Sequence, residues 1–257
     1  MTRPGAPPPA ARRTVSADER TAIEAVVGVI SDADLLRALR DARGRLFQRL
    51  EFLGDSVLDL ALVMHSVLEP DCPRCRASRR HGDPARLATD RQLAEQARRH
   101  GLGSWLEWEV SDERLADVVE AAVAVAWLSG GWSAVVGLVS AAVHPLGDGL
   151  GPALQDGGVT APGDPAGERR VGAALLELAA ALAAYRELPE GDEGDLSRRR
   201  AERHRTARVA EYAARTAVVV ASGDADTVSD RVERWLAADV LAHGADAALE
   251  RAAEVLR

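Results

Sequence analysis

QRLEFLGDSVL, residues 48–58, is the stretch from which the fold and the chemistry of this chain can be inferred. Glu51 and Asp55 are four residues apart, so a helix places both carboxylates on one face, one turn apart. Their neighbours are mainly apolar, and a carboxylate is costly to bury unless it is paired or binds a cation. The stretch therefore predicts a helix that carries a cation-binding acidic pair on an otherwise apolar surface.

A second acidic pair, Asp117 and Glu120, lies three residues apart within an Ala- and Val-rich stretch. Two such helices facing each other would bring four mutually repelling carboxylates together. Mg²⁺ suits such a cluster because it takes oxygen ligands and keeps several waters, one of which can attack a phosphodiester. The alternative is that both pairs are ordinary exposed positions of amphipathic helices.

The composition favours an all-α protein. The 257 residues are 47% hydrophobic but only 4% aromatic, and the abundant Ala and Leu are good helix formers. All 32 basic residues are arginine, which we attribute first to coding bias. The net charge of −8 argues against a generally basic nucleic-acid binder, although a local basic face remains open.

The chain is expected to be cytoplasmic and to have no membrane partner. No uninterrupted apolar run reaches the roughly 18 residues of a membrane span. Residues 1–17 have the composition of a disordered tail and lack the apolar segment of a secretory signal. Two cysteines do not make a disulfide framework.

The apolar spacing divides the chain into two helical domains. Helices are predicted over Thr21–Arg43, Leu46–Leu68, Leu87–His100, Leu115–Leu128 and Trp132–Val143. Residues 70–88 are predicted to be loop. Residues 144–167 are rich in Gly and Pro and predict a linker. The domains are therefore expected at residues 18–143 and 168–257.

Three segments of the first domain together resemble the ribonuclease III family. QRLEFLGDSVL resembles the signature E-x-x-E-F-L-G-D-[SA]-[VIL]-L, residues 116–131 resemble A-D-x-x-E-A…L-x-G-G, and residues 87–103 resemble the helix between them. The resemblance covers roughly residues 21–143. It implies catalytic Mg²⁺ (or Mn²⁺) ligands at Glu51, Asp55, Asp117 and Glu120. Gln48 replaces the first Glu of the signature, and residues 71–75 replace a D-E-G-[DE] motif of the family.

The second domain resembles a degenerate copy of the first. Residues 171–178 align with residues 53–60, residues 185–198 resemble the D-E-G-[DE] segment, and Asp230 and Glu233 align with the later acidic pair. Ala173 and Arg169 replace two of the acids, so this copy is expected to bind no metal. The alternative is a generic Ala-rich helical domain.

The family resemblance also implies that the two copies pair within the chain as a pseudo-dimer, because family members dimerise through their catalytic domains. The first copy lacks the D-E-G-[DE] acid, and the second copy has it as Glu193. We therefore expect Glu193 to complete the first site across the interface. A Glu193 carboxylate far from Asp55, or on an outer surface, would remove this hypothesis.

Cys72 and Cys75, followed by His81, form half of a zinc-site pattern. Two thiolates at this spacing suit tetrahedral Zn²⁺, but a structural site needs four ligands. His65 or His100 would complete it if the fold brought one close. The alternative is that both thiols are free, as is common in the cytosol.

Residues 198–208, RRRAERHRTAR, form the one concentrated basic run. Such a run can follow an RNA backbone, and it can equally be the solvated face of a helix. The candidate RNA contacts are Arg198, Arg199, Arg200 and Arg203. The second half shows no pattern of the double-stranded-RNA-binding domain that many family members carry.

Three functions follow from these patterns. The leading interpretation is a Mg²⁺-dependent endoribonuclease that hydrolyses structured or double-stranded RNA at a single competent site. The first alternative is a catalytically inactive module of the same fold that binds RNA or a protein, which the acidic net charge favours. The second is a metal-dependent enzyme that uses the fold on a small-molecule substrate.

Overall fold

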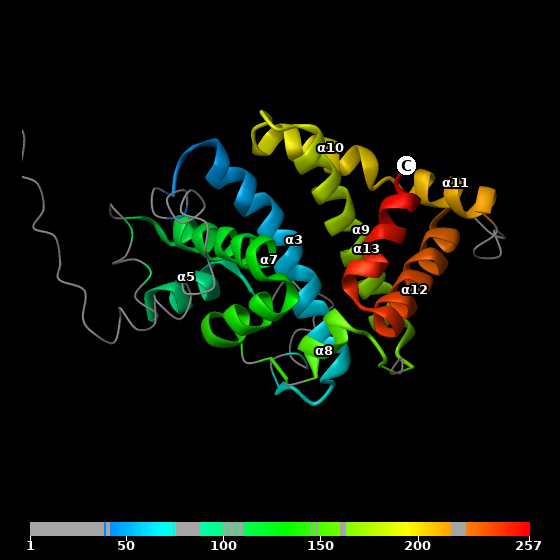
Figure 1. Ribbon diagram of the computed structural model, residues 1–257, viewed down its shortest axis with the longest axis horizontal. Coiled ribbons are helices and arrows are strands. Elements are labelled where there is room, and N and C mark those ends of the chain that lie inside the picture. Colours follow the sequence, from blue (N-terminus) through cyan, green and yellow to red (C-terminus); the bar gives the residue numbers. More distant parts are fainter. Residues whose placement is uncertain are drawn as a thin grey trace, which may run out of the picture.

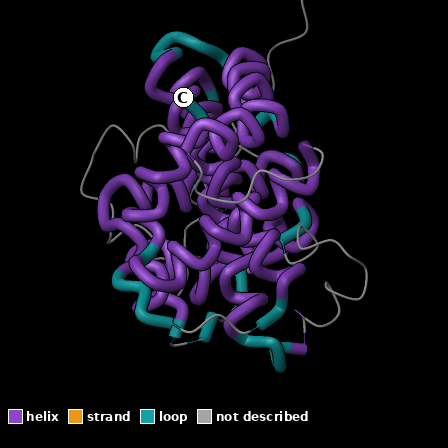
Figure 2. The backbone as a smooth tube through the Cα atoms, turned by 90° about the vertical axis from the view of Figure 1, so that its right-hand side faces the viewer, coloured by secondary structure: helices purple, strands orange, loops and turns teal. Residues whose placement is uncertain are grey.

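The computed structural model describes residues 39, 42–73, 75, 88–99, 102, 106, 110–144, 146–147, 149–159, 163–216 and 225–257. Every regular element in these ranges is a helix, and none is a strand (Figure 2). The all-α prediction is thereby confirmed. The predicted tail of residues 1–17 and most of the helix predicted over Thr21–Arg43 lie outside the described residues.

The first half is built on two long helices that lie side by side, α3 (Gly44–Leu68) and α7 (Asp112–Ala142) (Figure 1). The inner face of α3 is fully buried at Phe47, Leu50 and Leu53. A third helix, α5 (Asp90–Arg99), packs on α7. These helices match the predicted apolar stretches, with α5 shorter than the predicted Leu87–His100.

A positive φ of 61° at Gly131 divides α7 into two helical parts. Glycine adopts this conformation without the penalty that a Cβ brings. The break falls where the sequence predicted one helix to stop and the next to begin. The Ser111 side chain caps the start of α7 by accepting a hydrogen bond from the Arg114 backbone N–H, which satisfies one free donor of the first turn.

Among the described residues, α7 is the one helix long and apolar enough by composition to cross a membrane, over Asp112–Ala141. The sequence prediction of no such segment missed it, because Gly and Ser interrupt the apolar runs without interrupting the helix. More than half of the most apolar window of α7 is buried inside the protein. Packing against α3 and α5 accounts for its apolar composition.

The second half is centred on α9 (Pro165–Glu187), which packs against α12 (Ala225–His243) and α13 (Ala245–Val255). Two further helices, α10 (Glu193–Arg203) and α11 (Thr206–Thr216), run along one edge (Figure 1). The two halves meet where α3 packs against α9, and α10 also contacts α3. One continuous apolar core extends through both halves.

The segment predicted as a linker is more structured than its composition suggested. It contains α8 (Leu150–Gln155), whose Leu150, Ala153 and Leu154 are buried, and which contacts helices of both halves. The backbone N–H of Val159 donates to the Leu241 carbonyl at 2.8 Å, fastening the segment to the end of α12. It is therefore part of the packed structure, and α9 begins at residue 165, inside the segment predicted as a linker.

Candidate active site

Three of the four predicted acids meet at the crossing of α3 and α7. Glu51 comes from α3, Asp117 and Glu120 come from α7, and their carboxylate oxygens lie within 4.8 Å of one another. All three side chains are half-buried. The structure thus brings together the residues of two segments that are far apart in the sequence.

Gly54 explains why the two helices approach so closely at this point. A Cβ built on Gly54 would lie 1.8 Å from the backbone oxygen of Glu120. Because no side chain fits in that space, only glycine permits the crossing. The contact also fixes the turn of α3 that carries Glu51 against the turn of α7 that carries Glu120.

Crowding and burial raise the pKa values of these acids. Burial, followed by the charges of Asp117 and Glu193, raises the pKa of Glu51 to about 7. Burial, followed by the charges of Asp55 and Glu51, raises the pKa of Glu120 to about 9. Without a cation, Glu120 is therefore protonated at neutral pH, and the cluster resists full ionisation.

Asp55 lies at the edge of the cluster rather than within it. Its side chain is 59% exposed and lies 3.6 Å from Arg200 of α10, measured between Oδ2 and Nη1. Partial desolvation raises the pKa of Asp55, and Arg200 opposes this effect. Asp55 still acts on the cluster, since its charge is the largest of those that raise the pKa of Glu120.

The donor set fits a hard divalent cation. The Oε2 atom of Glu51 is buried and accepts no hydrogen bond within the described residues. Arg114 lies 3.8 Å from this atom and is closer to Asp117, at 3.0 Å. One arginine therefore serves two carboxylates, and a Mg²⁺ ion bound by the carboxylate oxygens would relieve the excess negative charge.

Glu193 occupies the first turn of α10, on the helix that contacts α3. Its side chain is exposed to solvent. Its charge nevertheless raises the pKa of both Glu51 and Asp117, so it is electrostatically coupled to the cluster. The completion of the site by Glu193 stays a prediction.

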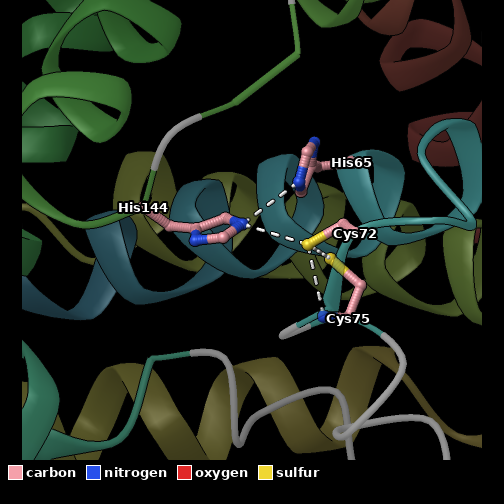
Figure 3. A group of neighbouring side chains, drawn as sticks. All are labelled: His65, Cys72, Cys75 and His144. Carbon is pink, nitrogen blue, oxygen red and sulfur yellow. Dashed lines mark hydrogen bonds between the residues drawn. The ribbon is translucent and has the colours of Figure 1, made fainter.

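Both cysteines lie near two histidines, one of which the sequence prediction had not included. The structure places His65 and His144 beside Cys72 and Cys75 (Figure 3). His65 was one of the two candidates for a fourth ligand. His81 and His100 lie outside the described residues. His144 was missed because it is 72 residues from Cys72 and is brought close only by the end of α7.

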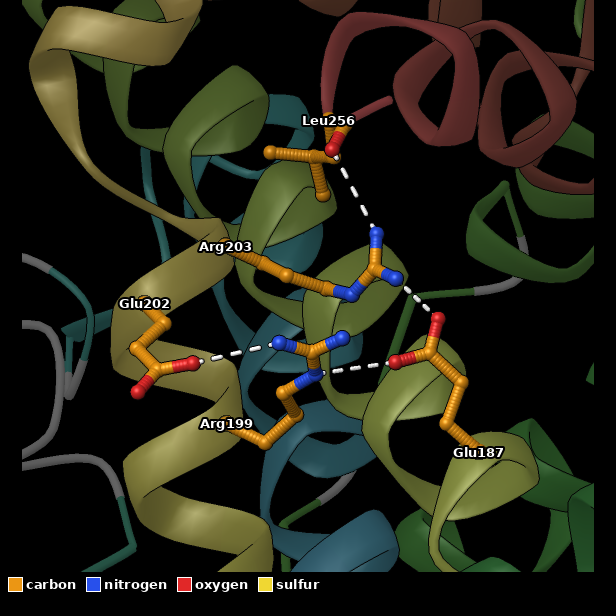
Figure 4. A network of polar contacts seen from close by, with 5 residues as sticks. All are labelled: Glu187, Arg199, Glu202, Arg203 and Leu256. Atoms are coloured by element: carbon orange, nitrogen blue, oxygen red, sulfur yellow. Dashed lines mark hydrogen bonds and ion pairs between the residues drawn. The ribbon is translucent and has the colours of Figure 1, made fainter.

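The four candidate RNA-binding arginines of α10 all pair with groups of the protein itself. Arg199 contacts Glu187 at 2.9 Å and Glu202 at 3.2 Å, and Arg203 contacts Glu187 and the Leu256 carbonyl (Figure 4). Arg198 pairs with Asp195 in the same helix. Arg200 pairs with Asp55 and with Glu177, the latter at 3.4 Å. These contacts favour the solvated-helix interpretation, and RNA binding by these residues stays a prediction.

The second half contains a helix crossing with the same backbone contact but different side chains. A Cβ on Gly172 of α9 would lie 1.8 Å from the backbone oxygen of Glu233 in α12. Beside this contact, Arg169 forms an ion pair with Asp230 at 3.1 Å. Burial raises the pKa of Glu233, and a hydrogen bond from Ser229 opposes this. The crossing therefore holds an ion pair where the first half holds clustered acids.

The segment that contains this site matches a known protein family. Residues 48–131 match the model of the ribonuclease III domain. The chain is 37% identical over 106 residues to a protein named Ribonuclease 3 from Azorhizobium caulinodans, covering 38% of this chain and 44% of that protein. It is 38% identical over 97 residues to a Ribonuclease 3 from Pseudothermotoga lettingae, covering 34% and 40%. The matched part thus spans less than half of the length of these relatives.

Proposed function

We propose that the ribonuclease III domain at residues 48–131 makes this chain a metal-dependent endoribonuclease acting on structured or double-stranded RNA. The observation that carries the proposal is the cluster of Glu51, Asp117 and Glu120 inside the matched segment, with oxygens within 4.8 Å. Clustered, partly buried acids with raised pKa values are typical of a functional site. Because all four acids that the family resemblance implies as metal ligands are present, a catalyst is favoured over an inactive module.

In this proposal Glu51, Asp117 and Glu120 would hold Mg²⁺ or Mn²⁺. Asp55 would contribute a further carboxylate from the exposed edge of the cluster. The bound ion would supply an activated water and neutralise charge on the phosphate. Glu120, with its pKa of about 9, would have to lose its proton to act as a ligand. The buried apolar residues around Gly54 close the inner side of the site to water. The exposed side of Asp55 leaves the substrate an approach from solvent.

We further propose that the second half is a degenerate copy that pairs with the first. One reciprocal pair of contacts between α3 and α9 supports this two-fold arrangement, in which residue i contacts j and the equivalent of j contacts the equivalent of i. Arg49 donates to the Tyr185 carbonyl at 2.6 Å. Their aligned counterparts, Gly167 and Val67, approach to 3.0 Å when a Cβ is placed on the glycine.

The second copy has an Arg169–Asp230 ion pair in place of clustered acids. A cation is not needed there, because the arginine already neutralises the carboxylate. The proposed enzyme therefore has one competent site and cuts one strand of a duplex in each binding event.

The test is incubation of end-labelled duplex and hairpin RNA with the protein and Mg²⁺. We expect single-strand nicks, visible on a denaturing gel while the duplex stays intact on a native gel. Glu51→Gln and Asp117→Asn should abolish cleavage, whereas Asp230→Asn, the matched change in the second half, should retain it. A wild-type protein as inert as Glu51→Gln toward many RNAs would overturn the proposal.

A non-catalytic binding module is the second candidate. The net charge of −8 and the engagement of Asp55 by Arg200 favour it. The same experiment separates the two, because a module of this kind would retain RNA in a gel-shift assay without cleaving it in Mg²⁺ or Mn²⁺.

A further inference from the structure

A second cluster of metal-ligating side chains lies away from the acids, at the other end of α3. His65 is in the last turn of α3, Cys72 and Cys75 lie in the segment that follows, and His144 comes directly after α7 (Figure 3). One ligand atom of each residue lies within 4.8 Å of those of the other three. Three separate pieces of the first half therefore converge on one point.

The spacing of these atoms fits tetrahedral zinc. With Zn–N bonds of about 2.0 Å and Zn–S bonds of about 2.3 Å, ligand atoms of a tetrahedron lie about 3.3 Å apart for two nitrogens and about 3.5 Å apart for nitrogen and sulfur. The Nε2 atoms of His65 and His144 are 3.2 Å apart. The Nε2 atom of His144 and the Sγ atom of Cys72 are 3.5 Å apart.

The two sulfur atoms are the part of the cluster that metal binding would change. They are 2.8 Å apart, which is longer than the disulfide bond length of about 2.05 Å. Two thiolates on one zinc ion lie about 3.8 Å apart. Binding therefore requires Cys72 and Cys75 to separate by about 1 Å. Cys72 is only partly buried, whereas Cys75 is fully buried.

The surroundings indicate a structural rather than a catalytic ion. His65, Cys75 and His144 are almost fully buried, at 3%, 0% and 6% exposure. Two thiolates would balance the charge of Zn²⁺, and two imidazoles complete four protein ligands. A site with four protein ligands keeps no position open for water or substrate, as in structural zinc sites.

We propose that His65, Cys72, Cys75 and His144 bind one Zn²⁺ ion that fastens the end of α3 to the end of α7. His65 is ten residues after Asp55 on the same helix, about 15 Å along its axis. The ion thus holds together the two helices whose crossing positions the acids, without touching the acids. The proposal rests on these four side chains alone and is independent of nuclease activity.

The test begins with the whole chain, expressed with added zinc and purified under reducing conditions. We expect about one zinc per chain by elemental analysis. Replacement by Co²⁺ should give the thiolate charge-transfer absorption and the visible bands of a tetrahedral S₂N₂ site. Removal of zinc by a chelator should lower the Tm by about 5 °C or more. These wild-type measurements do not depend on any variant folding.

Variants then assign the ligands. Cys72→Ser and His144→Ala should reduce bound zinc to less than about a fifth of the wild-type content, while His243→Ala, which changes an exposed histidine of α12, should leave it unchanged. Glu51→Gln should also keep its zinc, so that loss of nuclease activity and loss of zinc are distinguishable. Zinc-free wild-type protein with two titratable thiols, or with a Cys72–Cys75 disulfide detected by mass spectrometry, would overturn the proposal.

Discussion

The crossing of α3 with α7 and the crossing of α9 with α12 share a backbone contact and differ in the side chains around it. Gly54 lies against the carbonyl of Glu120, and Gly172 lies against the carbonyl of Glu233, with the same 1.8 Å approach of a built Cβ. The same local geometry therefore occurs in both halves. What separates a candidate catalytic site from a purely structural crossing is the charge placed around it.

In the first half the charges repel, and in the second half they attract. Glu51, Asp117 and Glu120 crowd together, and the pKa values of two of them reach about 7 and about 9. In the second half Arg169 pairs with Asp230 at 3.1 Å. A cation would relieve the repulsion at the first crossing, whereas Arg169 already neutralises Asp230 at the second. One substitution, an arginine at the position aligned with Glu51, accounts for much of this difference.

The largest expected difference between the two crossings is in the rate of RNA cleavage. Glu120→Gln keeps the shape of the side chain and removes a metal ligand, so we expect cleavage of duplex RNA to fall by about 10³-fold, or about 4 kcal/mol. Glu233→Gln, the aligned change, should alter the rate less than about threefold. Single-turnover cleavage in saturating Mg²⁺ measures both. Equal losses in the two variants would show that the second half is not catalytically silent.

The next prediction concerns the glycine contact that both crossings share and its effect on stability. Gly54→Ala and Gly172→Ala each force a methyl group against a backbone carbonyl, so the helices must separate. Overpacking of this kind costs about 1–3 kcal/mol, partly offset by the better helix propensity of alanine. We expect a net loss of about 1–2 kcal/mol in the free energy of unfolding for each variant, measured by urea denaturation.

Gly137→Ala is the matched control for these two variants, because a Cβ at that position of α7 meets nothing within 4 Å. It should be neutral or stabilising by up to about 1 kcal/mol. If Gly172→Ala were as harmless as Gly137→Ala, the two crossings would not be equivalent in solution.

The sequence predicted the features that depend on local pattern. The spacing of the apolar residues was enough to predict α3 and α7 as helices. The glycines at 130 and 131 predicted the interruption of α7 at residue 131. The acids could be assigned to one cluster because their spacing matched a known family. By contrast, α8 was missed, since three buried residues in a six-residue helix show no measurable period.

Features that depend on packing between distant segments were not predictable. Asp55 was expected within the acidic cluster, but it lies at the edge, where Arg200, 145 residues later, forms an ion pair with it from α10. His144 joins Cys72 and Cys75 only because α3 and α7 end near each other. No sequence spacing records such a contact, which is set by the whole course of the helices in between.

The two crossings should also differ in the pH dependence of stability in metal-free protein. Glu120 has a pKa of about 9 when folded, against an ordinary value of 4.5. The folded state therefore binds a proton that the unfolded state has released, and its stability falls as the pH rises from about 4.5 to about 9. Glutamine cannot ionise, so Glu120→Gln should unfold like wild type near pH 4.5 and become more stable than wild type by about 1–3 kcal/mol near pH 9.

Glu233→Gln should show a weaker form of the same trend, because Ser229 and Arg169 lower the pKa that burial raises. Urea denaturation in chelator across this pH range measures both differences. Added Mg²⁺ should remove the advantage of Glu120→Gln, since the ion stabilises the ionised wild-type cluster and binds the variant less well. A Glu120→Gln advantage that persisted in saturating Mg²⁺ would mean that the cluster is strained for a reason other than a missing cation, and the metal assignment would fail with it.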